Sequence, residues 1–359
     1  MIIKTYVRYI VKEYLLIFLN VTMVFYSLIF ILNIFKKLSF FKNVDTNFLF
    51  PIFLTFLNVP SILYDIFPFI FLISTQFYFI KVFEKNELII FKNFGLSNIK
   101  ILKILILSAL IFGMFIIFVF YNFSSKAKKI YLNLKNEYTL DNRYLAVITE
   151  NGLWIKDEIN ESILIVNAVA IDGNYLTDVS IVVLSKDYDL IRNIEAQKID
   201  ITKLLWKATN VKIHKNNITI EKDELELETH FNLEKINNLF SNLSSLTMWE
   251  LVKLKKDYKS LGYSTSEIDN HQHKIITYPI YLMIMVLLSS IIMFNIKTNK
   301  TRVFNIILGI SLSVIIYYIR YFFNLLGENN QIPIIMSIWF PLIIMLILCS
   351  IGMVRINEK

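Results

Sequence analysis

Two adjacent lysines are the side chains best suited to bind an anion. Lys36 and Lys37 end the first long apolar stretch of the chain, and a later apolar stretch carries Arg320 near its own end. Lysines at the end of a membrane helix often do no more than extend their ammonium groups to the surface, so a structural role is an equal alternative. These cations fall on the membrane face where positive charge is disfavoured, however, and an anionic ligand entering from the outer leaflet would meet them there. Arg320 would add to the same positive field or, equally, pair with Asp65 in the second apolar stretch.

A short polar segment, residues 84–95, is the second candidate. The spacing of Glu87, Leu88 and Phe91 predicts an amphipathic helix, and Gly95 can adopt the left-handed conformation that ends such a helix. The plain alternative is a connector at the membrane surface. The functional alternative is a coupling helix that docks in a groove of a cytoplasmic partner, where Glu87 would pair with a base and Phe91 would be the apolar anchor.

The sequence motifs of most enzyme classes are absent. There is no G-x-x-x-x-G-K-[ST] phosphate loop, so any ATP must be bound and hydrolysed by another chain. The single cysteine, Cys349, excludes a disulfide within the chain and a zinc site built on several thiolates. His271 and His273, with Asp269 nearby, come closest to a metal site, but such histidines are more often solvated residues at the start of a helix. We therefore expect no metal, no cofactor and no nucleic acid partner.

The composition indicates a membrane protein. The chain has 359 residues, of which 55% are hydrophobic, and its mean hydropathy of +0.54 exceeds that of ordinary globular domains. A helix that crosses a membrane needs about 20 apolar residues. We expect three such spans in an N-terminal half, residues 1–122, and three in a C-terminal half, residues 274–359. The six spans are residues 15–35, 62–82, 99–121, 275–296, 303–325 and 334–354.

The polar insert between the two halves has the pattern of a β-domain over residues 123–246. Runs of alternating apolar and polar residues are separated by turn signals such as Asp172-Gly173, which predicts an antiparallel sandwich or jelly roll. The runs are residues 144–148, 162–171, 179–184, 206–214 and 218–228.

A helical linker, residues 247–273, follows the predicted β-domain. Thr247 with Glu250 forms a capping box, and Ser264 with Glu267 repeats it at the start of a helix that should continue into the fourth span. The expected fold is therefore an α-helical membrane protein with six transmembrane helices and an inserted all-β, jelly-roll-like domain.

The distribution of charge predicts the orientation of the spans. Lys+Arg 37 against Asp+Glu 29 leaves a formal charge of +8. The chain ends and the loops after the second and fourth spans are rich in lysine and arginine, whereas residues 327–333, after the fifth span, contain neither. Because basic loops stay in the cytoplasm, we expect both termini to be cytoplasmic and the β-domain to be external.

Two other classes of function are weaker alternatives. An intramembrane enzyme that modifies lipids would need paired carboxylates or a nucleophile with an evident base, and the spans offer neither. A membrane sensor with an extracytoplasmic β-domain would need a signalling module, for which the predicted cytoplasmic segments are too short.

Several motifs in their order and spacing resemble the LptF/LptG permeases of lipopolysaccharide export. They are LNVP at 57–60, NELIIFKNFGLS at 86–97, ENGLWIKD at 150–157 and HKIITYP at 273–279. The resemblance covers essentially the whole chain, and GLWIKD is more similar to LptG than to LptF.

The resemblance implies a permease that extracts lipopolysaccharide from the outer leaflet of the bacterial inner membrane. It implies a heterodimer with an LptF-like permease, an LptB-like ATPase dimer that binds the ATP, and LptC-like and LptA-like proteins as a periplasmic bridge. Glu87 matches the acidic coupling-helix residue that contacts the ATPase. Lys36 and Lys37 match two basic positions that meet lipid phosphates, and a third basic position falls on Phe30 here. Arg320 has no counterpart in the resemblance and would be a replacement for that missing cation.

Overall fold

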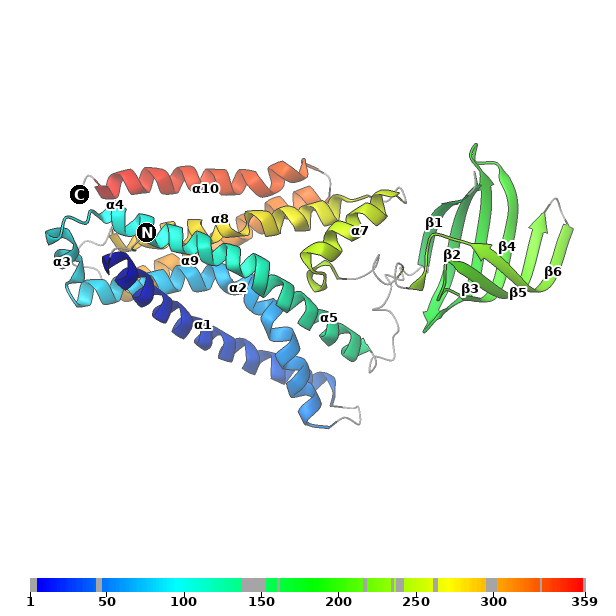
Figure 1. The fold of residues 1–359 in the computed structure, drawn as a ribbon, viewed down its shortest axis with the longest axis horizontal. Coiled ribbons are helices and arrows are strands. Elements are labelled where there is room, and N and C mark those ends of the chain that lie inside the picture. Colours follow the sequence, from blue (N-terminus) through cyan, green and yellow to red (C-terminus); the bar gives the residue numbers. More distant parts are fainter. Residues whose placement is uncertain are drawn as a thin grey trace. The chain divides into compact units, whose positions relative to one another are not determined.

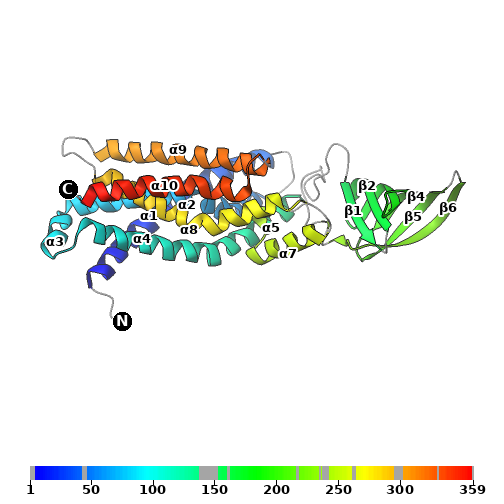
Figure 2. The same ribbon diagram turned by 90° about the horizontal axis from the view of Figure 1, so that it is seen from above.

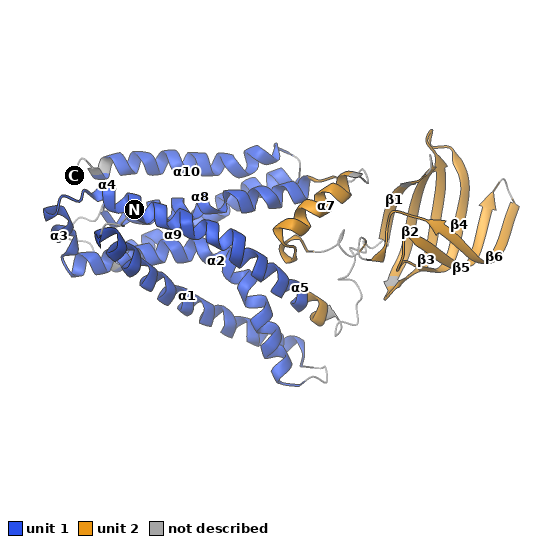
Figure 3. Ribbon diagram, viewed as in Figure 1, with its two compact units in different colours: residues 1–131, 266–359 blue, residues 132–265 orange. Residues whose placement is uncertain are grey.

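Helices and one β-sheet make up the described part of the chain (Figure 1). The computed structural model describes residues 5–42, 47–136, 153–159, 162–215, 218–233, 236, 242–260, 264–294, 302–329 and 331–357. They divide into two compact units, a helical one of residues 1–131 and 266–359 and a second of residues 132–265 (Figure 3).

The described residues of all six segments expected to cross the membrane are helical. Among the described residues, six helices are long and apolar enough to span: Thr5–Phe40, Leu49–Glu84, Asn98–Lys135, Ser266–Phe294, Val303–Glu328 and Ile334–Val354. The first two, α1 (Thr5–Phe40) and α2 (Leu49–Glu84), have 36 residues each. At a rise of about 1.5 Å per residue they exceed a hydrocarbon core of about 30 Å. The chain thus stays helical beyond the end of its apolar stretch.

The third span continues into the region expected to begin the β-domain. Helix α4 (Asn98–Phe115) passes through a π-helical turn, η1 (Ile116–Tyr121), into α5 (Asn122–Asn136). In α5, Ala127 and Tyr131 are buried, so its amphipathic sequence has an apolar face to pack. The transition from membrane helix to β-domain therefore lies later than residue 123.

Helix α8 (Ser266–Phe294) is the centre of the helical unit. In its most apolar stretch of 18 residues, 67% of the residues are buried, against 17% in the corresponding stretches of α1 and of α9 (Arg302–Glu328). It runs beside α9 and α10 (Ile334–Asn357) (Figures 1 and 2). A core cluster joins α8 to α2, α9 and α10 through Leu72, Tyr281, Ile284, Met285, Leu287, Ile316, Leu342, Met345 and Cys349. Helices α1 and α9 consequently leave most of their apolar side chains on the surface of this chain.

Close approach of α4 to α8 depends on a glycine. A Cβ atom at Gly113 would lie 2.8 Å from the Cα of Pro279 and 2.9 Å from its Cβ. Small residues at such crossings let membrane helices pack backbone to backbone.

We expect Gly113→Ala to destabilise the helical unit by about 1–3 kcal/mol, because the backbone of Pro279 cannot move aside as a flexible side chain can. Thermal unfolding in detergent measures the change. Gly352→Ala is the matched control, since its new methyl group would meet only the Ile291 side chain, at 2.8 Å. Equal losses for the two variants would contradict the packing argument.

The second unit contains a six-stranded antiparallel sheet. Its described strands are β1 (Leu153–Ile159), β2 (Ser162–Asp172), β3 (Tyr175–Ser185), β4 (Leu190–Asp200), β5 (Leu205–Lys215) and β6 (Ile218–Glu228). An inserted all-β region is therefore confirmed. The strands pair in consecutive order, so the crossover that defines a jelly roll does not occur among them.

Four of the predicted runs correspond to strands, namely those at 162–171, 179–184, 206–214 and 218–228. The run at 144–148 lies outside the described residues. The turn at Asp172-Gly173 is confirmed, with Gly173 at φ +57° between β2 and β3. Strands β1 and β4 were not predicted.

Strand β4, which alternation did not reveal, crosses a bend in the sheet. Across β3, β4 and β5 the bend lies at the row of Asp178, Gln197 and Asn210. Asp178 and Asn210 have φ of 48° and 53°, in the left-handed region that residues other than glycine rarely adopt. On the two sides of this row Ile194 and Ile199 are both fully buried, although an odd spacing places them on opposite faces of a regular strand. The buried face of the sheet thus changes at the bend, and the sequence period changes with it.

A buried carboxylate joins β1 to the segment after β6. Asp157, 2% exposed, accepts hydrogen bonds from the Thr229 hydroxyl at 2.8 Å, from the His230 backbone N–H at 2.9 Å and from His230 Nδ1 at 2.9 Å. Removal of the carboxylate leaves the buried Thr229 hydroxyl and the part-buried backbone N–H of His230 without this acceptor.

We expect Asp157→Ala to cost about 3 kcal/mol, the loss of hydrogen bonds to a charged acceptor. Hydrogen exchange of the β1 amides should then accelerate by roughly 100-fold. Asp187→Ala, which removes an exposed carboxylate from the same unit, should leave this exchange unchanged. Unchanged β1 protection in Asp157→Ala would show that the three hydrogen bonds do not stabilise the sheet.

Candidate functional site

The two lysines at the end of α1 point in different directions. Lys36 is exposed and Lys37 is buried, because consecutive residues on a helix are about 100° apart. The Lys37 ammonium donates a hydrogen bond to the Tyr131 hydroxyl and lies 4.1 Å from the centroid of that ring. The described structure therefore presents one exposed ammonium and holds the other against α5.

Arg320 lies against an aromatic ring. Its guanidinium carbon is 3.7 Å from the centroid of the Tyr281 ring, a cation–π contact between α9 and α8. No ion pair between Arg320 and Asp65 occurs among the described residues. The alternative in which Asp65 is the structural partner of Arg320 is thus not what the fold provides.

An ion-paired network joins the start of α8 to the end of α9. Glu328 accepts hydrogen bonds from Asn270 at 3.1 Å, from Lys274 at 3.1 Å and from Asn324 at 3.0 Å. Nearby in the sequence, the His271 Nε2 lies 3.0 Å from the Tyr121 hydroxyl oxygen. The bonds of Glu328 to Asn270 and Lys274, and of His271 to Tyr121, hold helices together. Sequence spacing alone did not reveal these pairs because the two partners of each lie far apart in the chain.

The predicted short helix is present as α3 (Glu87–Asn93). Gly95 follows it with φ +76°, and its N–H bonds to the Lys92 carbonyl at 2.9 Å. The Leu96 N–H bonds to the Phe91 carbonyl at 2.9 Å, which completes the C-terminal cap. The expectation that Gly95 ends this helix is confirmed.

Helix α3 is attached to α1 by its acidic residue and its aromatic residue. Glu87 accepts a hydrogen bond of 2.8 Å from the Tyr9 hydroxyl. The Phe91 ring meets the Tyr9 ring edge-on at 6.4 Å between centroids, and Phe91 is only 8% exposed. The ion pair of Glu13 with Lys81 links α1 in turn to α2.

The burial of Phe91 corrects one expectation. Phe91 was expected to face outward as an apolar anchor, but it packs within the chain. The exposed apolar residues are instead Phe94, at 81%, Ile89, at 59%, and Ile90, at 49%. Because the run from Leu88 to Phe91 is apolar on every side, its periodicity could not show which side faces α1. Leu88 itself is half-buried.

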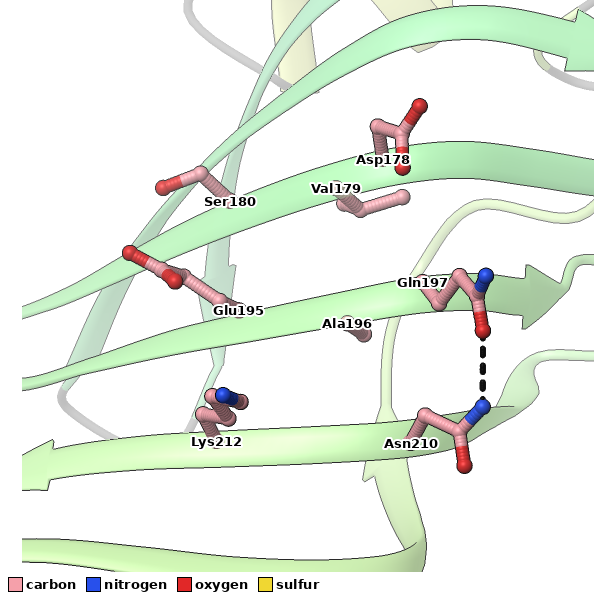
Figure 4. A pocket seen from close by; sticks show the side chains of 8 residues that line it. All are labelled: Asp178, Val179, Ser180, Glu195, Ala196, Gln197, Asn210 and Lys212. Carbon is pink, nitrogen blue, oxygen red and sulfur yellow. Dashed lines mark hydrogen bonds between the residues drawn. The ribbon is translucent and has the colours of Figure 1, made fainter.

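A shallow polar pocket lies on the sheet, at the bend. Figure 4 shows its lining side chains, among them the carboxylates of Asp178 and Glu195 and the ammonium of Lys212. The Asn210 amide donates a 2.7 Å hydrogen bond to the Gln197 side-chain oxygen across two strands. The pocket follows from the interrupted strand pairing, which the sequence did not predict, and its mixed charges indicate no particular ligand.

Comparison with protein families gives one match that covers nearly the whole chain. Residues 8–355 match the family model described as the lipopolysaccharide export system permease LptF/LptG. No curated protein matches the chain. The six membrane-spanning helices and the inserted sheet are in keeping with that match.

Proposed function

The chain belongs to the LptF/LptG family of lipopolysaccharide export permeases, and we propose that it extracts lipopolysaccharide from the outer leaflet of the inner membrane and passes it to a periplasmic bridge. The family match over residues 8–355 is the observation that carries this proposal. The chain is a multi-pass membrane protein, and the permeases of its family are transporter subunits rather than enzymes. A separate LptB-like ATPase dimer supplies the energy, and an LptF-like permease completes a heterodimer in which this chain is the LptG-like member.

In this proposal the orientation follows the distribution of basic residues. Both termini and α3 lie in the cytoplasm, and the sheet lies in the periplasm, where LptC-like and LptA-like proteins receive the lipid. The sheet belongs to a unit joined to two spans, the third and the fourth. Movement of these helices would therefore reach the sheet through the chain itself.

Helix α3 is proposed to couple the permease to the ATPase. Glu87 would pair with a base of the ATPase groove, and the exposed Ile89, Ile90 and Phe94 would supply its apolar contacts. The hydrogen bond from Tyr9 to Glu87 supports this role, because a push on α3 reaches α1 directly. The helix that carries the lysines would then move when the ATPase closes.

The proposed substrate contacts are two lysines at the other end of α1 and an arginine of α9. Lys36 is free to meet a headgroup phosphate, and Lys37 would exchange its contact with Tyr131 for one. Phe30 packs on Phe56 at 4.8 Å between ring centroids, so no cation is available at that position. Arg320, half-buried on Tyr281, is the proposed replacement.

The ionic contacts and the apolar contacts with the lipid differ in the binding free energy that they contribute, and therefore in their roles. A cation near an anionic lipid surface contributes about 1 kcal/mol, whereas each buried CH₂ group contributes about 0.8 kcal/mol. Several acyl chains therefore supply most of the binding energy. The cations select and orient the phosphorylated headgroup.

Copurification with mass spectrometry tests the proposal. A tagged chain extracted in mild detergent should bring along an ATPase subunit and a second six-span permease, and lipopolysaccharide should stimulate ATP hydrolysis by the complex. Nucleotide turnover or covalent lipid modification by the isolated chain, without companions, would contradict it.

A further inference from the structure

Helix α7 (Met248–Ser260) presents a face for which lipopolysaccharide export assigns no role. Its exposed residues, among those whose burial the structure describes, are Trp249, Val252, Lys253, Lys256 and Lys259. At 3.6 residues per turn they lie within an arc of about 120°. One face of the helix is therefore aromatic at its start and basic over the rest of its length.

The side of α7 opposite to this face is packed against other residues of the chain. Leu251 and Leu254 are 1% and 3% exposed, so the opposite face packs inside. Glu250 closes the capping box, accepting hydrogen bonds of 2.8 Å from both the backbone N–H and the hydroxyl of Thr247. Glu250, the acid of the first turn, is thus hydrogen-bonded to Thr247, and the charged residues of the exposed face are all lysines.

Trp249 is the most unusual residue of this face. Its side chain is 83% exposed, and a large aromatic ring left in water on a helix otherwise docked to its protein is costly. Tryptophan is enriched where an apolar body and a polar N–H both find partners, at the boundary between lipid headgroups and acyl chains. Lysine next to it extends its ammonium to the phosphates at the same level.

We propose that this face of α7, Trp249 with Val252, Lys256 and Lys259, binds the anionic lipid surface of the membrane that the helical unit spans. The exposed lysines complement phosphate groups in charge. The centre of a protein interface is depleted in lysine, which argues against a protein partner on the same face. The interaction is with bulk anionic lipid and is distinct from headgroup binding at Lys36 and Lys37.

The covalent connection of α7 allows it to reach that surface. Helix α7 ends at Ser260, and the membrane-spanning α8 begins at Ser266. The intervening residues can extend over at most about 20 Å. The polar first turns of α8, residues 266–274, extend about 14 Å beyond its apolar part. The connection is long enough to span this distance, so α7 can lie at the level where the apolar part of α8 begins.

Spin-label accessibility in vesicles tests the proposal on the full chain. A nitroxide is attached at Val252→Cys in a Cys349→Ala background, which keeps Trp249, and a control label is attached at Leu190→Cys, 67% exposed in the same unit. Oxygen, which concentrates in lipid, and a water-soluble nickel chelate, present on both sides, are compared as relaxing agents. The vesicles contain phosphatidylcholine alone or with phosphatidylglycerol, and neither lipopolysaccharide nor nucleotide, so failure of export does not affect the result.

In phosphatidylglycerol vesicles the ratio of relaxation by oxygen to relaxation by nickel should be several-fold higher for the label at 252 than for the label at 190. The reason is that each lysine raises membrane partition about fivefold. Lys256→Gln with Lys259→Gln, or Trp249→Ala, should bring it to the control value. The matched pair Lys198→Gln with Lys203→Gln, two exposed lysines of the sheet unit, should have no effect. Equal nickel access at 252 and 190 overturns the proposal, and so does shielding from both agents in every vesicle, which would indicate a covering protein.

Discussion

Glu87→Lys is expected to reduce lipopolysaccharide export by at least about 30-fold, because loss of one partner from a desolvated interfacial charge pair costs about 2–5 kcal/mol. The substituted lysine would also face the base with which Glu87 is proposed to pair. Export is measured as transfer of lipopolysaccharide from proteoliposomes that contain the complete complex. Copurification of the ATPase should fall in parallel, since the lost contact is between subunits.

Two controls separate coupling from folding. Glu84→Lys makes the same charge change at an exposed position, the last residue of α2, and should retain export. Tyr9→Phe removes the 2.8 Å hydrogen bond to Glu87 without a change of charge. If Tyr9→Phe lost as much ATPase binding as Glu87→Lys, the role of Glu87 would be to hold α3 on α1, and the proposed contact with the partner would be wrong.

Charge reversal of both lysines, Lys36→Glu with Lys37→Glu, is expected to have the second large effect. Each reversal removes an attraction of about 1 kcal/mol to headgroup phosphate and adds a comparable repulsion. The lipopolysaccharide concentration that half-stimulates the ATPase should rise by about 30-fold for one reversal and further for two. Activity without lipid should stay the same, because both lysines lie at the opposite end of α1 from Tyr9, the residue that contacts α3.

Single variants then distinguish the two lysines. Lys126→Glu reverses an exposed lysine of α5 and is the matched control for Lys36→Glu, since Lys36 is exposed as well. Tyr131→Phe removes the hydroxyl that Lys37 contacts; if Lys37 must leave Tyr131 to bind lipid, this variant should bind lipopolysaccharide at least as well as the native chain. An unchanged half-stimulating concentration in the double reversal would exclude both lysines from the substrate site.

The difference in exposure between these two lysines is caused by a neighbour that is distant in the sequence. In the sequence Lys36 and Lys37 are equivalent, two cations at one helix end. Tyr131, 94 residues later, makes them different by burying one of them. In the same way Tyr9, 78 residues before Glu87, turns Phe91 inward and leaves Phe94 outside.

Features that depend on consecutive residues were determined by the sequence alone. A stretch of about 20 apolar residues must be helical in a membrane, because every backbone group there needs a partner within the segment. The Gly95 cap and the Thr247–Glu250 capping box likewise involve groups a few residues apart. Family membership rests on motifs of the same local kind, kept in order along residues 8–355.

Only the tertiary structure decided which face of each element is used. The bend at Asp178 and Asn210 reverses the buried side of neighbouring strands, and no single strand contains the information that its neighbours bend at the same row. The direction of a side chain is set by packing against residues that the fold brings together from distant parts of the chain. For that reason the spans and caps could be predicted, while the partners of Lys37, Glu87 and Arg320 could not.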